Sequence, residues 1–291
     1  MSNLQRFYTR FIDLLHQLTP HDNFRQQIRI PKLSDKQLIA LSLAAEAASI
    51  DSELNLFTQL PTEVDGLIER TVYNKRRRQL SNITEQFRQQ IAERVIPNET
   101  YHLIDSMPLE VCKYSRAKRS RICTESNVSS PDYGYCAAQN MHYYGYKIHA
   151  VCTQQGVFKY FNLSQASLHD IHYLEEVSDH LSHCVLIGDK GYLSQQYQYQ
   201  LFKDSGVKLE TPKRRNQQSS KPFPKVYRKA RKRIETLFSQ LCDQFMIRRN
   251  YAKSFNGFST RVLAKITALT MIQWSNQLSG NKLNNLKIAI S

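Results

Sequence analysis

The chain is short of acidic residues and has no long apolar run. Its 291 residues hold 40 Lys and Arg against 25 Asp and Glu, a formal net charge of +15. Such an excess is typical of proteins with a polyanionic partner, either nucleic acid or an anionic membrane surface. No apolar run reaches the length of a membrane-spanning helix, and the first residues lack the apolar stretch of a signal peptide. We therefore expect a nucleic-acid partner, no membrane and a cytoplasmic location.

The six cysteines include no Cys-x-x-Cys pair. Scattered single cysteines in a long chain favour reduced cytosolic thiols over a disulfide framework. A zinc site is a weaker alternative, because its candidate ligands have wide and irregular spacings: Cys112, Cys123, Cys136 and His142. Apolar residues make up 41% of the chain and charged residues 22%, which predicts a folded protein of one large or two ordinary domains.

The first hundred residues have helical patterns. Ser34 and Gln37 have the spacing of a capping box, and apolar residues recur every three or four positions from Leu80 to Val95. Between them, residues 70–78 are strongly basic and contain no acid. This run is either a solvated helix face or a basic helix that lies along DNA. We predict a helical, DNA-end-binding domain over residues 1–98.

After Pro97 the pattern changes to short apolar runs that predict strands. They lie at 101–106, 143–152, 157–163, 183–188 and 207–211, and helices are expected near 168–177, 193–203, 225–248 and 258–269. This order predicts an α/β domain over residues 99–291, with a mixed sheet flanked by helices. Residues 109–141 form an insert too long for a hairpin, which is either disordered or folded over a nucleic-acid strand.

Three acidic residues carry the strongest chemical signal. Asp105 and Asp189 are placed at the ends of predicted strands, and Glu235 lies inside a basic helix. A carboxylate at the edge of a buried strand is costly unless it is paired or binds a metal. Each acid alone has an ordinary structural explanation in a turn or a helical ion pair. Together, in so basic a chain, they predict a divalent-metal site that acts on a phosphate polymer.

The motifs around these acids resemble those of DDE transposases of bacterial insertion sequences, in particular the insertion sequence 982 family. The resemblance covers residue 101 to the end of the chain, and the helical N-terminus more loosely. It rests on five motifs in this order: Ile-Asp-Ser-Met-Pro at 104–108, Tyr-Tyr-Gly-Tyr-Lys-Ile-His at 143–149, Leu-His-Asp at 168–170, Gly-Asp-Lys-Gly-Tyr at 188–192 and Arg-Lys-Arg-Ile-Glu at 231–235.

The resemblance implies a ribonuclease H-like catalytic domain in which Asp105, Asp189 and Glu235 are both catalytic residues and metal ligands. Related families often place a Tyr, an Arg and a Lys at fixed spacings around the Glu. Here Arg231 fits, whereas Tyr227 is one residue too far away and Cys242 stands at the Lys position. The departures concern the accessory contacts and leave the three acids in place.

The implied activity is metal-dependent cleavage of the ends of an insertion sequence and their transfer into target DNA. Two Mg²⁺ ions, replaceable by Mn²⁺, would assist attack by water or a DNA 3′-hydroxyl. The partners would be terminal inverted repeats and target DNA, bound by a homo-oligomer in the bacterial nucleoid. Two alternatives remain open at this stage, a ribonuclease H-like nuclease without strand transfer and a non-catalytic DNA-binding repressor.

The predicted DNA contacts are basic residues in the two basic tracts and beside the acids. Residues 208–233 form the second tract and hold a single acid, Glu210. Clustered Lys and Arg neutralise backbone phosphates and make binding dependent on salt. The predicted contact residues are Arg70, Lys75, Arg76, Arg77, Arg78, Lys190, Lys213, Arg214, Arg215, Arg228, Arg231 and Lys232.

Overall fold

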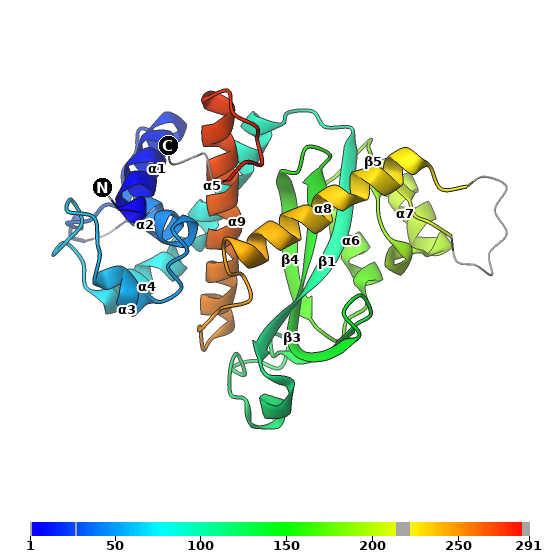
Figure 1. Cartoon of the computed structure of the whole chain (residues 1–291), viewed down its shortest axis with the longest axis horizontal. Helices are drawn as coiled ribbons and strands as arrows, with labels where there is room; N and C mark the ends of the chain where they lie inside the picture. The colour runs from blue at the N-terminus through cyan, green and yellow to red at the C-terminus, as the bar shows by residue number, and fades with distance from the viewer. Residues whose placement is uncertain (1, 27, 214–221, 287–291) are drawn as a thin grey trace. The chain divides into compact units, whose positions relative to one another are not determined.

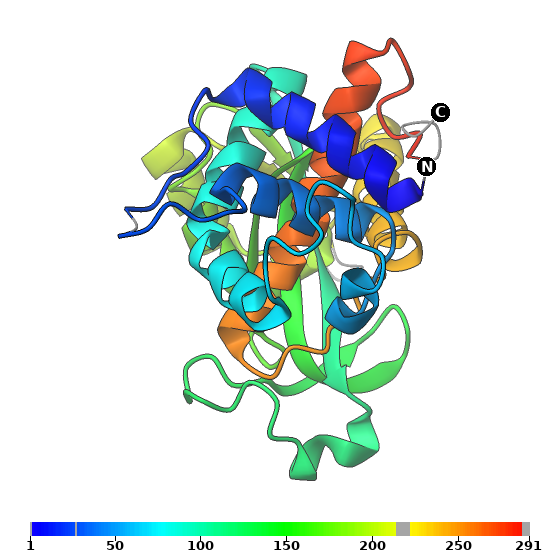
Figure 2. The same ribbon diagram turned by 90° about the vertical axis from the view of Figure 1, so that its left-hand side faces the viewer.

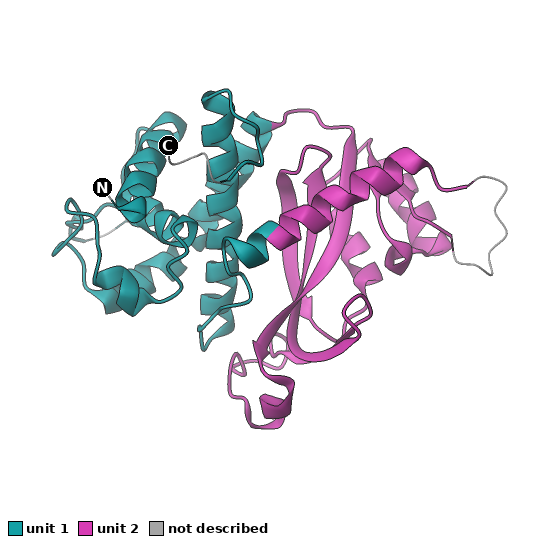
Figure 3. Ribbon diagram, in the orientation of Figure 1, with its two compact units in different colours: residues 1–95, 240–291 teal, residues 96–239 magenta. Residues whose placement is uncertain are grey.

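A computed structural model describes residues 2–26, 28–213 and 222–286. The chain forms two compact units, unit 1 from residues 1–95 and 240–291, and unit 2 from residues 96–239 (Figure 3). This division differs from the predicted domains, because the C-terminal segment belongs to the helical unit. Residues 214–221, which include the predicted contacts Arg214 and Arg215, lie outside the described residues.

Unit 1 is helical. Its helices are α1 (Asn3–Leu18), α2 (Asp35–Ala47), α3 (Glu53–Phe57), α4 (Arg70–Gln79), α5 (Ser81–Val95) and α9 (Phe255–Leu278). Helices α1 and α2 lie side by side (Figure 2), and α9 packs against both α2 and α5. The N-terminal helices therefore share their core with a helix from the far end of the chain.

Two predicted features of unit 1 are confirmed. The capping box is present, since the Ser34 hydroxyl accepts from the Gln37 backbone and the Gln37 side chain accepts from Ser34 N–H. The apolar stripe at 80–95 becomes α5, with Phe87 and Ile91 buried. Helix α9 extends beyond the helix expected near 258–269, and residues 257–276 are buried almost continuously. A helix that is buried all round forms the centre of a packed unit.

Buried charges connect α2 with α9. Glu46 on α2 forms ion pairs with Arg261 and Lys265 on α9, and all three side chains are less than a tenth exposed. Lys265 Nζ also donates to the Phe245 carbonyl at 2.6 Å. Burial opposes ionisation of Glu46, but Lys265 and Arg261 outweigh it and hold the pKa of this carboxyl below its usual range.

Unit 2 contains one six-stranded mixed sheet. The strands are β1 (Tyr101–Cys112), β2 (Asp132–Cys136), β3 (Met141–Thr153), β4 (Phe158–Gln165), β5 (Val185–Ile187) and β6 (Lys208–Glu210). The order is β2-β3-β1-β5-β6, with β4 also paired to β3. Strand β3 is antiparallel to both β1 and β4. Strand β5 is parallel to β1, and β6 is parallel to β5. The predicted mixed sheet is confirmed.

Two details of the predicted sheet are wrong. Strand β1 continues six residues past the predicted end at Ser106, so Asp105 lies within a strand and not at its end. Pro108 stays in the strand, opposite Lys147. The sheet also has a strand that was not predicted, because β2 forms within the insert and pairs with β3 from Asp132 to Cys136. The four candidate zinc ligands do not form a metal-binding group among the described residues.

Helices cover both faces of the sheet. One face packs against α6 (Tyr173–Val177) and α7 (Gln195–Ser205) in a cluster that includes Ile104, Val151 and Leu186. Helix α8 (Lys225–Asp243) crosses in front of β4 and β1 (Figure 1). It ends at Asp243, five residues before the predicted end at Arg248. Met246, three residues after this helix, adopts a positive φ of 48°. Short 3-10 helices follow β1 (η1, Tyr114–Arg119), precede α6 (η2, Asp170–His172) and follow β5 (η3, Lys190–Tyr192).

No helix in the described part of the chain is both long enough and apolar enough to cross a membrane.

Candidate active site

Asp105 and the preceding residue, Ile104, lie on opposite faces of strand β1. Ile104 is buried in the cluster beneath α6 and α7. Successive side chains of a strand point to opposite faces, so Asp105 faces the other side of the sheet. There its Oδ2 lies 4.0 Å from Arg231 Nη2 of α8. The strand and the helix thus bring a carboxylate and a guanidinium together.

Asp105 is held in a state that resists ionisation. Burial raises its pKa to about 7, and the nearby acids Asp189 and Glu235 add to the increase. The Ser106 N–H, which donates to Asp105 Oδ1 at 2.9 Å, and the Arg231 charge work in the opposite direction. Like charges raise a carboxyl pKa only when they are close. The three predicted acids are therefore electrostatic neighbours.

A tight turn after β5 positions Asp189. Its Oδ1 accepts from Gly191 N–H at 2.6 Å and caps η3. A Cβ at residue 191 would lie 2.9 Å from Asp189 Oδ1, closer than real Cβ contacts. Only glycine fits this position without moving the carboxylate. Since β5 pairs in parallel with β1, the turn lies beside the strand that carries Asp105.

Glu235 is exposed on α8, one helical turn after Arg231. The structure brings Glu235, Asp105 and Asp189 into electrostatic range, yet no three such side chains of the described residues are gathered closely enough to hold one ion. Carboxylates repel one another unless a cation neutralises them. Three carboxylates are hard oxygen donors, the type that Mg²⁺ and Mn²⁺ prefer. The donor set therefore fits a divalent metal.

A fourth acid, Asp170, lies next to this group and was missed as a site residue. Its Oδ2 accepts from the Ser106 hydroxyl at 3.0 Å, and its Oδ1 forms an ion pair with Lys147 at 2.9 Å. The same Oδ2 would lie 3.6 Å from a Cβ on Gly191. Asp170 thus connects β1, β3 and the turn that holds Asp189. Its place in the Leu-His-Asp motif was the available signal, but its partners are distant in sequence.

His149, from the Tyr-Tyr-Gly-Tyr-Lys-Ile-His motif, is buried and stacks on Tyr173 with ring centres 5.0 Å apart. Its Nε2 lies 2.7 Å from Ser164 Oγ. Burial lowers the pKa of His149 to about 4, although Asp170 works against the decrease. A neutral, stacked imidazole has a packing role and does not supply charge to the site.

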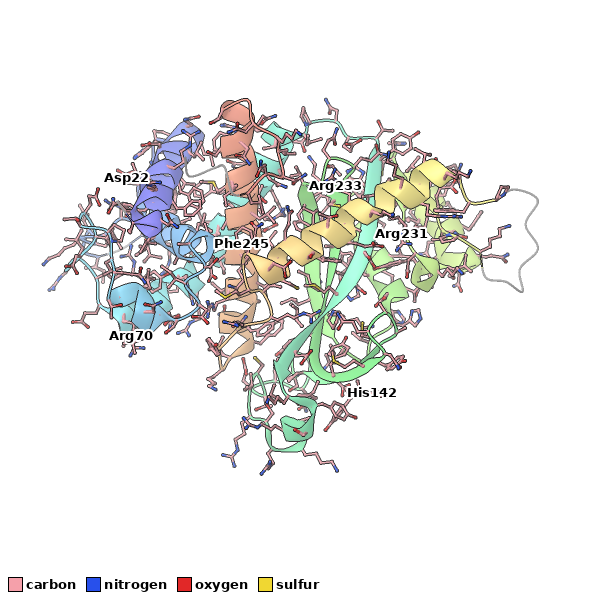
Figure 4. All side chains as sticks on the ribbon, in the orientation of Figure 1. Asp22, Arg70, His142, Arg231, Arg233 and Phe245 are labelled. Carbon is pink, nitrogen blue, oxygen red and sulfur yellow. The ribbon has the colours of Figure 1, made fainter. Side chains whose placement is uncertain are left out.

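The predicted basic contacts around the acids differ in exposure. Arg228 and Lys232 of α8 are exposed, as are Lys190 and Lys213, whereas Arg231 is half-buried beside Asp105. Figure 4 labels Arg231 and Arg233 on α8, where they flank Lys232. The helix that carries Glu235 therefore presents several cations to solvent.

Two residues of the N-terminal basic run are committed to contacts within unit 1. Arg76 pairs with Asp35 at 2.6 Å, and Arg77 pairs with Glu53 at 2.8 Å. Arg77 is only 7% exposed. The predicted DNA contacts at these two positions are thus internal ion pairs, whose acidic partners are far away in sequence. Arg70 and Lys75 are exposed.

The insert forms an aromatic surface that sequence reasoning missed. Cross-strand pairs align Tyr133 with Tyr144, and Tyr135 with His142. Tyr114 of η1 packs on both Tyr133 and His142, at ring distances of 5.7 and 6.0 Å. The same insert carries the exposed cations Lys113, Arg116, Lys118, Arg119 and Arg121. Exposed rings together with cations are typical of surfaces that bind unpaired bases.

The fold is a mixed α/β sheet flanked by helices, and it brings acids from three separate elements near one another. The chain matches the family described as Transposase DDE domain over residues 99–271, and it belongs to that family. A solved structure, the Mos1 transposase paired-end complex with left transposon end, is similar with 9% identity and a TM-score of 0.24, over 94% of this chain and 86% of that one. So low a TM-score adds no argument. No curated protein matches the chain.

Proposed function

We propose that this transposase-family protein cleaves the DNA ends of an insertion sequence and joins them to target DNA. The observation that carries the proposal is the placement of the acids: β5, which ends just before Asp189, pairs with the strand of Asp105, and Glu235 lies one helical turn from Arg231, which contacts Asp105. Family membership supports the reaction class. The finer placement in the insertion sequence 982 family rests on sequence motifs alone.

The residues have distinct tasks in this proposal. Asp105, Asp189 and Glu235 would hold two divalent ions, which would activate the attacking oxygen and stabilise the leaving one. Asp170 and the Gly191 turn hold Asp189 and β1 in place. Arg231 places a positive charge beside Asp105, where it balances acidic repulsion.

DNA binding would use the exposed cations of α8 together with the insert. Arg228 and Lys232 lie on the same helix as Glu235, so backbone phosphates held there would be close to the acids. The aromatic surface of the insert would stack on bases that are unpaired at a cleaved end. To cleave both ends of the insertion sequence and join them to target DNA, at least two active sites would be required. A homo-oligomer on DNA is therefore part of the proposal.

The test is a cleavage assay on a DNA fragment that carries both flanks of the gene. Wild-type protein should release the element ends with Mg²⁺ or Mn²⁺ and not with EDTA. Asp105→Asn, Asp189→Asn and Glu235→Gln should each reduce cleavage by at least about a hundredfold, because each removes a ligand charge at little change of volume. Asp179→Asn, an exposed acid in unit 2, is the matched control and should cleave normally.

The products separate the alternatives. Joined DNA containing target sequence supports transposition, whereas cleavage without joining supports a ribonuclease H-like nuclease. Sequence-specific binding without cleavage supports a repressor. Full activity in the Asp105→Asn variant would overturn the assignment of the acids.

A further inference from the structure

Unit 1 contains an open pocket of about 570 Å³ that the proposed active site does not use. Its walls come from three segments: residues 51–54 before and within α3, one face of α4, and residues 251–261 leading into α9. Arg70, where α4 begins, is labelled in Figure 4. The pocket lies wholly within unit 1.

Positive charge exceeds negative charge in the pocket. Its lining has five cations against two carboxylates: Arg70, Arg77, Arg78, Lys253 and Arg261 against Asp51 and Glu53. Both acids already have partners. Glu53 accepts from Arg77 at 2.8 Å and from Asn74 at 2.6 Å, and Asp51 lies 3.9 Å from Arg249.

Three of the five cations have no acidic partner within the described part of the chain. These are Arg70, Arg78 and Lys253. In addition, Arg77 Nε is buried without a hydrogen-bond partner among the described residues. The pocket therefore has cationic groups whose charge the described residues do not satisfy.

Two helices of unit 1 begin beside the pocket. Helix α4 begins at Arg70, and its N-cap residue Glu69 makes no side-chain capping bond. Helix α9 begins after Ser254, and a Cβ on Gly257 in its first turn would lie 4.0 Å from Arg78 Cδ. Arg78 thus passes over the first turn of α9. Ser254 caps α9 by accepting from Gly257 N–H, so of these two ends only that of α4 is uncapped, and its N–H groups and helix dipole favour an anion.

We propose that this pocket binds a backbone phosphate of DNA and so clamps the duplex to unit 1. The proposal rests on the proposed function, because it takes DNA as the natural ligand. Phosphate carries the anionic oxygens that Arg70, Arg78 and Lys253 would engage together. Of the DNA contacts predicted in the basic run, Arg70 and Arg78 would hold phosphate here, whereas Arg76 and Arg77 form internal ion pairs. Lys253, in the loop before α9, would contact the same phosphate.

The experiment measures duplex binding by the full chain across 50–200 mM salt. Arg70→Ala combined with Lys253→Ala removes two exposed, unpaired cations and should spare the fold. Affinity should fall on the order of tenfold for each contact removed, and the log–log salt slope should decrease by about 2. Arg29→Ala with Lys282→Ala removes the same charge from exposed sites of unit 1 outside the pocket and should change neither quantity. Arg70→Lys with Lys253→Arg should restore most of the binding.

Each outcome decides the question. Equal binding by the pocket and control variants, with wild-type cleavage intact, would overturn the pocket and leave the proposed function standing. Failure of wild-type protein to bind or cleave DNA would overturn both. Inorganic phosphate at matched ionic strength distinguishes a DNA phosphate from free phosphate as the ligand of the pocket. If phosphate alone raises the wild-type melting temperature while the pocket variant binds DNA normally, the ligand is free phosphate and the DNA clamp is wrong.

Discussion

Arg231 Nη2 on α8 lies 4.0 Å from Asp105 Oδ2 on β1. Residues four positions apart share a helix face, so Glu235 lies on the same side of α8 as Arg231. The attraction between Arg231 and Asp105 therefore also directs Glu235 towards the strand. One ion pair helps to place two of the three acids that the proposed chemistry needs.

A divalent cation should stabilise the protein through these acids. In thermal unfolding, Mg²⁺ at about a hundred times its dissociation constant should add about 2.7 kcal/mol. That corresponds to an increase in melting temperature of roughly 5–10 °C for a unit of the size of unit 2. NaCl of equal ionic strength is the reference, and Asp179→Asn should match the wild type. Asp105→Asn should lose most of the increase, and an unchanged increase there would place the metal elsewhere.

The aromatic surface of the insert should distinguish unpaired from paired DNA. Tyr133→Ala should weaken binding to DNA with an unpaired end by about 5- to 150-fold, the range for losing one stacked base. Tyr133→Phe keeps the ring and should bind normally. Tyr199→Ala, an exposed tyrosine of α7, is the control. Stacking would be excluded if the Ala and Phe variants of Tyr133 bound equally.

Glu46 should be a main determinant of the stability of unit 1. Glu46→Gln leaves Lys265 and Arg261 buried without a negative partner, which should cost about 3–5 kcal/mol in denaturant unfolding. Asp65→Asn, at an exposed site of unit 1 outside the helices, should change stability by less than about 0.5 kcal/mol.

The same residue predicts a pH dependence. Because the folded pKa of Glu46 is lowered, its stabilisation is present above the unfolded value of about 4.3 and is lost as the pH falls through the folded value. The acid side of the stability profile should therefore flatten in Glu46→Gln. A profile as steep as that of the wild type would show that other groups control acid unfolding.

The helical segment 1–98 should not fold alone. Its α2 and α5 pack against α9, whose buried face would be missing from the fragment. Circular dichroism should show low helix content and no cooperative melting, in contrast to the full chain. A fragment that melts cooperatively and binds the element ends would restore the original domain boundary at residue 98.

Local signals accounted for most of what the sequence predicted correctly. The Ser34–Gln37 capping box involves residues three apart, and the α5 stripe repeats within one helix, so neither depends on distant parts of the chain. Strand β2 depends instead on pairing with β3, and its own Tyr-Gly-Tyr pattern is too short to predict it. The end of β1 was misjudged because Pro108 usually interrupts a strand, although a ladder position that needs no N–H donor can accept it.

The candidate site shows the same limit. Asp105, Asp189 and Glu235 could be named because each lies in a recognisable motif. The internal pairing of Arg76 with Asp35 and of Arg77 with Glu53 joins residues 41 and 24 positions apart. Asp170 is 64 positions from Ser106. Such contacts follow from tertiary packing, which charge patterns along the chain do not encode.

Gly191 shows how an inert residue can be constrained as tightly as a charged one. Because a Cβ there would meet Asp189 Oδ1 at 2.9 Å, a single methyl group is sufficient to displace a proposed ligand. In a mutational scan, this glycine would therefore behave like an active-site residue, although it offers the substrate no functional group. Tolerance to substitution around this site is governed by free space as much as by chemistry.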